Sequence, residues 1–81
     1  MVEGAVGLVV QFLDRSTGAV DSRLWDFGDG AQSVEQDPVH RYTETGAFTV
    51  ALTVANAGGS NTFTARNLVV IIPAPKAALE V

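Results

Sequence analysis

The chain has 81 residues, a net charge of −4 and no cysteine. Its length allows a single domain, whose stability must come from core packing because neither a disulfide nor a thiolate metal site can form. The acidic balance argues against nucleic acid and anionic membrane surfaces as partners, since both select basic faces.

The same sequence offers no segment that would span or enter a membrane. No apolar run approaches the roughly 18 residues that a spanning helix needs. The first residues lack a basic region followed by an apolar one, so we expect neither direct membrane insertion nor a signal peptide here. With 47% hydrophobic and 17% charged residues, the composition is that of a globular domain.

The chain begins with a segment of weak pattern, residues 1–7, which holds two glycines and no alternation. We expect it to be a frayed lead-in. Residues 8–13 then read as a strand rich in β-branched and aromatic side chains. Its polar Gln11 marks one face as the wetter one, so Val9 and Leu13 are expected to point outward.

The second strand is predicted over residues 20–27, after a turn at 14–18. Period-two alternation places Trp25 and Phe27 inward, with Leu24 and Asp26 outward. The glycines of Gly28-Asp29-Gly30 then end the strand.

The remaining elements are three strands separated by turn residues. A loop at 31–37, with room for one short edge strand, leads to a short strand at 39–42. Residues 47–55 alternate most clearly, residues 56–60 read as a hairpin loop, and residues 61–72 form the last strand, with Asn67 as a bulge. Two prolines after residue 72 end the pattern, so we expect a domain at 1–73 and a linker or added tail at 74–81.

Turn signals recur about every 8–12 residues with no helical period, which is typical of an all-β, antiparallel sandwich. The motifs are also specific. They are Trp-Asp-Phe-Gly-Asp-Gly at 25–30, Pro-Val-His-Arg-Tyr at 38–42, Gly-Ala-Phe-Thr-Val-Ala-Leu-Thr-Val at 46–54, Val-Gln-Phe at 10–12 and Asn-Ala-Gly-Gly-Ser at 56–60. In this order they resemble the PKD (polycystic kidney disease) domain over about residues 8–72. The resemblance implies an immunoglobulin-like β-sandwich of about seven strands.

The chain departs from that family at its start. The family usually opens with an extra strand, and only residues 1–7 are available for it here. The first strand is then short, absent or supplied from elsewhere, which would leave six strands and an unpaired edge. Such an edge is a template for pairing, so self-association through it is a hypothesis.

The outward positions depart as well. Side chains at Val9, Leu13, Leu24, Ala51 and Ala55 are apolar where the family commonly has Thr or Ser. They are either scattered surface hydrophobics or a contiguous apolar face that meets a partner or another copy. Among them Leu24, Ala51 and Ala55 are the strongest candidates for an interaction face, because the resemblance puts their two strands in one sheet.

Two carboxylates next to the glycines raise the question of calcium. Asp26 and Asp29, with Asp21, could offer oxygens, but no spacing resembles a calcium loop. We expect Asp29 to serve a turn and Asp26 to accept backbone N–H bonds. Neither a metal nor a cofactor is therefore expected.

Aromatic and histidine positions are interpreted as scaffold. Trp25 could be a sugar-stacking platform, but its shared face with Phe27 favours the core. The lone His40 is expected to donate to a backbone carbonyl, and Tyr42 to bond near the turn that ends at Gly46. No serine lies in a nucleophile elbow, and Gly28 to Gly30 is not a phosphate loop, so we expect no enzyme activity and no catalytic residue.

The resemblance implies a non-catalytic module of a larger extracellular or cell-surface protein, of the kind found in adhesion proteins and beside enzymes. One hypothesis is domain spacing and protein–protein interaction. The alternative is an accessory polysaccharide- or collagen-binding module of a secreted hydrolase, which for sugars would need solvent-facing aromatics. Phe63, Phe48 and Tyr42 are the candidates for that role.

Overall fold

The computed structural model describes residues 1–73, 75, 77 and 79. It is all-β in this part of the chain, with no helix long and apolar enough to cross a membrane. The strands are β1 (Val2–Ala5), β2 (Val9–Gln11), β3 (Ser22–Asp26), β4 (Gln32–Ser33), β5 (Val39–Arg41), β6 (Gly46–Asn56) and β7 (Gly59–Ile72).

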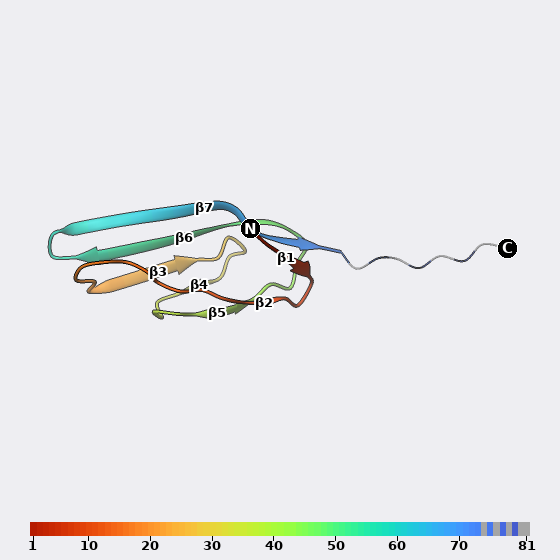
Figure 1. The fold of residues 1–81 in the computed structure, drawn as a ribbon, viewed down its shortest axis with the longest axis horizontal. Helices are drawn as coiled ribbons and strands as arrows, with labels where there is room; N and C mark the ends of the chain where they lie inside the picture. The colour runs from red at the N-terminus through yellow and green to blue at the C-terminus, as the bar shows by residue number, and fades with distance from the viewer. Residues whose placement is uncertain (74, 76, 78, 80–81) are drawn as a thin grey trace.

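Two sheets pack face to face as a sandwich (Figure 1). The larger sheet has the order β1-β7-β6-β3-β4, and the smaller one pairs β2 with β5. All pairs are antiparallel except β1 and β7, which run parallel. The immunoglobulin-like sandwich of seven strands predicted from the sequence is confirmed, with one parallel pair added.

The core lies between the sheets and is dominated by aromatic side chains. Phe12 lies 5.5 Å from Trp25 and 5.1 Å from Phe27 between ring centroids, and Tyr42 lies 4.9 Å from Phe48. Tyr42 is fully buried. Ring pairs at these separations add to the stabilisation that comes from buried area. The buried cluster is completed by Val10, Val50, Val69 and Ile71.

The expectation of a frayed lead-in at residues 1–7 is wrong. Val2–Ala5 forms β1, paired with Val69–Ile72 of β7. A Cβ on Gly4 would lie 2.8 Å from a terminal methyl of Leu8, so the Leu8 side chain packs directly against this glycine. The glycine and the short length of the segment hid the strand from the sequence pattern. Of the three alternatives for the first strand, the short strand is the one found.

The long hairpin of β6 and β7 carries an irregularity at the expected place. Phe48 pairs with Val69 while Val50 pairs with Ala65, so three residues of β7 lie opposite Thr49. Asn67, at the centre of this bulge, has a φ of 50°, and its N–H donates to Thr49 Oγ1 at 3.3 Å. The turn of this hairpin is tighter than predicted, because Asn56 already pairs with Gly59.

Candidate interaction surfaces

The stretch from Trp25 to Gly30 forms a closed corner at the end of β3. Asp26 Oδ1 accepts the N–H of Gly28 at 2.9 Å, and Asp29 Oδ1 accepts the N–H of Ala31 at 3.1 Å. The Phe27 N–H donates to the Ala31 carbonyl at 3.1 Å. Both candidate calcium carboxylates therefore have backbone partners, and no group of three possible metal ligands occurs among the described residues.

His40 lies inside this corner and differs from its expected role. Its Nε2 is 2.6 Å from Asp29 Oδ2, rather than facing a backbone carbonyl. The imidazole also stacks on Phe27, with 4.3 Å between centroids and 5° between planes. The expected hydrogen bond to a carbonyl is wrong because the Asp29 turn presents a carboxylate to β5, which is a stronger acceptor.

Tyr42 ties the corner to β5. Its hydroxyl donates to the Phe27 carbonyl at 2.9 Å, so the expected partner near the turn that ends at Gly46 is wrong. Burial, together with the negative charges of Asp29 and Asp26, raises the pKa of the Tyr42 phenol to about 12. The phenol therefore stays neutral and remains a hydrogen-bond donor across the physiological pH range.

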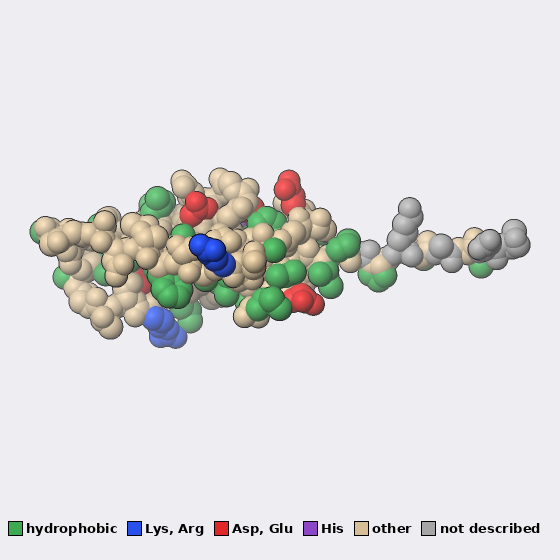
Figure 2. Space-filling model, turned by 90° about the horizontal axis from the view of Figure 1, so that it is seen from above, with side chains coloured by type: hydrophobic (Ala, Val, Ile, Leu, Met, Phe, Trp, Pro, Cys, Tyr) green, Lys and Arg blue, Asp and Glu red, His purple; other side chains and the backbone are tan. Residues whose placement is uncertain are grey.

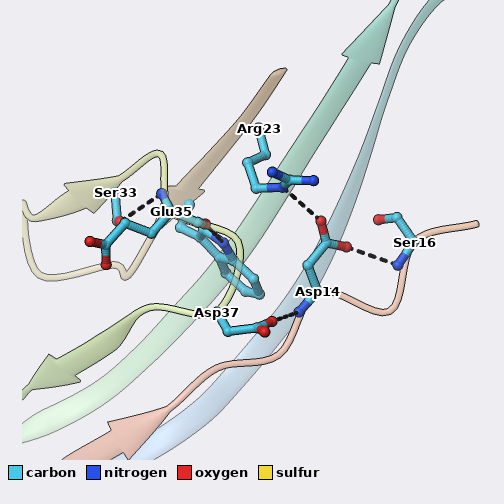
Figure 3. A network of polar contacts seen from close by, with 7 residues as sticks. Asp14, Ser16, Arg23, Ser33, Glu35 and Asp37 are labelled. Atoms are coloured by element: carbon cyan, nitrogen blue, oxygen red, sulfur yellow. Dashed lines mark hydrogen bonds and ion pairs between the residues drawn. The ribbon is translucent and has the colours of Figure 1, made fainter. Parts of the chain in front are cut away.

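A second polar network holds the chain between β2 and β3 (Figure 3). Asp14, whose side chain is only 3% exposed, accepts from Arg23 Nε at 2.9 Å and from the Ser16 N–H at 2.8 Å. Asp37 accepts the Asp14 N–H at 3.0 Å. Hydrogen bonds from Ser16, reinforced by Arg23, lower the pKa of Asp14 despite its burial. The sequence pattern indicated the turn but not the ion pair, because Asp14 and Arg23 meet only across the fold.

The outer face of the large sheet holds the proposed interaction residues of β3 and β6. Leu24 is 40% exposed and lies opposite Thr53, which separates Ala51 from Ala55 along β6. Thr53 Oγ1 is 2.9 Å from Thr62 Oγ1 of β7. The three residues thus share one face, as predicted, but hydroxyl groups interleave with them. Seen from above, hydrophobic side chains on the surface gather mainly toward the right-hand end of the sandwich, with other side chains and backbone between the rest (Figure 2).

Val9 and Leu13 lie elsewhere, on the smaller sheet and the segment that follows it. They are 56% and 49% exposed. They do not join the Leu24 face, because β2 belongs to the other sheet. The five candidates therefore belong to two separate surfaces.

A third surface, which was not anticipated, is an apolar groove of about 600 Å³ along the side of the sandwich. We call it the lateral groove. It lies where the two sheets part between β2 and β7. Its floor includes Val10, Phe12, Trp25, Val50 and Leu52, and its rim includes Leu13, Arg15 and Phe63. Alternation alone could not reveal it, because the groove depends on which strand edges remain uncovered.

Exposed aromatic side chains are few in the described chain. Phe63 is 73% exposed, whereas Phe48 and Tyr42 are buried. Trp25 is 5% exposed, and its indole N–H donates to the Glu35 carbonyl at 2.9 Å. Of the aromatics considered for sugar stacking, Phe63 alone presents its ring to solvent.

The chain is similar to one family model and to parts of several larger proteins. The family model described as "PKD domain" matches residues 2–71. Collagenase ColA of Bacillus cereus is 45% identical over 60 residues, covering 69% of this chain and 6% of the relative. The microbial collagenase of Vibrio alginolyticus is 38% identical over 73 residues, covering 85% and 9%. Pre-pro-metalloprotease PrtV of Vibrio cholerae is 38% identical over 60 residues, covering 74% and 6%. The chain thus spans less than a tenth of these relatives.

Proposed function

Because the chain belongs to the PKD domain family, we propose that it is a non-catalytic accessory module of a larger extracellular protein, where it contacts a protein substrate. The observation that carries the proposal is the small share of each relative that the similarity covers, 6% of one collagenase and 9% of another. A match of that size corresponds to one module within a long chain rather than to a whole enzyme.

Collagen is the proposed protein substrate. Two of the relatives are named collagenases, and an accessory module raises the local concentration of its enzyme at the substrate. The surface favours protein over polysaccharide: Phe63 is the one exposed aromatic ring of the three considered for sugar binding, whereas the lateral groove offers an apolar floor to a polypeptide. Spacing of neighbouring domains is compatible with the same role.

Co-sedimentation of the purified domain with insoluble collagen, cellulose and chitin tests this proposal. We expect saturable binding to collagen, no binding to either polysaccharide, and no cleavage of collagen in the same tubes. Binding to a polysaccharide alone would instead favour a polysaccharide-binding module. Failure to bind any of the three would contradict the binding role, and domain spacing would be the remaining proposal.

A further inference from the structure

The lateral groove is bordered by a strand edge that nothing covers in the described chain. The outer edge of β7 is paired with β1 only from Val69 to Ile72. The stretch from Gly59 to Arg66 has no strand on its outer side among the described residues. It contains no proline and has one charged residue, Arg66. Natural edges are usually blunted by charges, prolines, bulges or short length; this stretch has one charge and no proline, and the bulge lies only at its Arg66 end.

The hairpin register tells which backbone groups of that edge point outward. Asn56 and Gly59 close a two-residue turn, so they form a hydrogen-bonded pair and the pairs alternate from there. Ser60, Thr62 and Thr64 then direct their backbone N–H and C=O groups away from β6. These groups satisfy another extended chain but not a globular surface or a sugar, because only a strand repeats donors and acceptors at the same spacing.

The same edge already accepts an added strand. β1 joins β7 in parallel at Val69–Ile72, and Val2 of β1 lies at the end of the groove. The free part of the edge is separated from this pairing only by the bulge at residues 66–68. A second extended segment could extend the coverage of β7 along the groove without displacing any strand of the fold.

The side chains of the groove define what such a segment carries. Phe63 and Ala65 line the groove from β7, and Leu13 and Trp25 are also among its lining residues, so alternate residues of the ligand should be apolar. At one end Arg15 is exposed, and no ion pair or hydrogen bond of its side chain occurs among the described residues. A carboxylate on the ligand would complement that charge.

We propose that the lateral groove and the open β7 edge bind an extended peptide segment of a partner protein, which adds as a strand, fills the groove with alternate apolar side chains and places an acidic residue at Arg15. The inference goes beyond the proposed function: a collagen triple helix, with glycine at every third residue and many prolines, does not add as a β-strand, so the groove is assigned a separate, extended ligand.

Titration of the full chain with a synthetic peptide tests the inference. The probe alternates valine with threonine, carries one glutamate near an end and matches the open edge in length. The control probe replaces the valines with proline, which cannot pair along a strand. In ¹H–¹⁵N NMR spectra we expect the valine peptide to shift amides of Gly59–Arg66 and the Trp25 indole. The proline peptide should leave them in place.

Two substitutions separate the groove from the general surface. Phe63→Glu should weaken binding about tenfold or more, because it removes an apolar anchor, and Arg15→Glu should weaken binding through the glutamate. Val34→Glu is the matched control: Val34 is 71% exposed, against 73% for Phe63, and lies at the opposite side of the large sheet. It should leave the affinity unchanged.

Three results would overturn the inference. They are no binding of the valine peptide at millimolar concentration, binding that Phe63→Glu does not change, and a dimer of the free chain that Phe63→Glu dissociates, which would assign the edge to a second copy. Collagen co-sedimentation that survives Phe63→Glu, while peptide binding is lost, would support the two proposals at separate surfaces. Loss of collagen binding in the unaltered chain would instead reject the proposed function.

Discussion

At the scale of single residues, the carboxylates of the corner are occupied by the fold itself. Asp29 is shared between the Ala31 N–H and His40, and His40 packs between Phe27 and the edge of Tyr42, 4.7 Å away at 83°. Asp29 is partly buried, so the loss of either partner leaves a partly desolvated group without its hydrogen bond, which destabilises the fold. The same contacts that make Asp29 a structural residue leave it poorly placed to collect a metal ion.

The Asp29 contacts predict a specific dependence of stability on pH. Desolvation raises the pKa of Asp29, but hydrogen bonds from His40 and Ala31 and the imidazole charge outweigh it, so the pKa lies below its ordinary value. A lowered pKa contributes stability that is fully present above the unfolded-state value and is lost as the pH falls through the folded-state value. Tyr42 stays neutral throughout this range, and Asp26 is the other nearby carboxylate.

We therefore expect Asp29→Asn to lower the free energy of unfolding at pH 7, and the difference from the unaltered chain to shrink as the pH falls below the ordinary carboxyl pKa, about 3.9, toward the lower pKa of folded Asp29. Urea denaturation at pH 7 and pH 3 measures both values. Glu44→Gln removes the same charge from an exposed turn and should give a small difference at both. A gap for Asp29→Asn that is the same at both pH values would contradict the assigned role.

At the scale of elements, the corner joins β3 to the rest of the large sheet through a close backbone approach. Gly28 has a φ of 85°, and a Cβ there would collide with the Thr49 carbonyl oxygen of β6. Gly30 has a φ of 94° but open space around its Cα. The two glycines of one motif therefore have different reasons to be glycine, one of them steric as well as conformational.

This difference predicts unequal effects of alanine. Gly30→Ala should lower the free energy of unfolding by about 1–2 kcal/mol, because an L-residue is strained in a left-handed backbone conformation. Gly28→Ala should cost about 3 kcal/mol or more, because the clash with Thr49 adds an overpacking penalty. Urea denaturation of the two variants compares them directly. Equal losses of stability would show that the backbone near Thr49 moves aside at no cost, and that the positive φ alone accounts for both effects.

The strand edges belong to the same scale. β1 covers the end of β7 but not Gly59–Arg66, and β2 has a partner on one side only. The unpaired edge that was expected at the start of the chain is thus found elsewhere. The uncovered backbone lies mainly on β7, beside the lateral groove. Self-association, the hypothesis drawn from the sequence, is the competing use of this edge, and light scattering that shows a strict monomer at high concentration would contradict it.

At the scale of the whole molecule, the core is complete before the end of β7. The last residue of the buried cluster is Ile71, and Pro73 follows the strand. The predicted domain boundary after residue 73 falls at this point, while residues 74, 76, 78, 80 and 81 lie outside the described residues. We therefore predict that residues 1–73 are sufficient for folding.

A chain that ends at Pro73 should accordingly unfold at the same urea concentration as the full chain, since no buried contact of the core is removed. A chain that ends at Leu68 is the contrasting variant. It loses Val69 and Ile71, which are 0% and 2% exposed, together with the partner of β1, and should not fold. A clear loss of stability on removal of residues 74–81 alone would place the domain boundary later.

The sequence by itself determined the family, the strands other than β1 and most of the core. Alternation showed which sides of residues 20–27 and 47–55 are buried, and the glycine-rich turns marked where strands end, because both signals are local in the chain. It also indicated the bulge at Asn67, since asparagine tolerates a positive φ.

Only the tertiary structure decided which residues from distant segments meet. It alone paired His40 with Asp29, Tyr42 with the Phe27 carbonyl and Arg23 with Asp14, and it showed β1 as a parallel strand that glycine allows to lie close to Leu8. The lateral groove belongs to this class, because an uncovered edge exists only relative to the strands that cover the others. Alternation assigns a face to each side chain, but it does not specify which strand lies beside which.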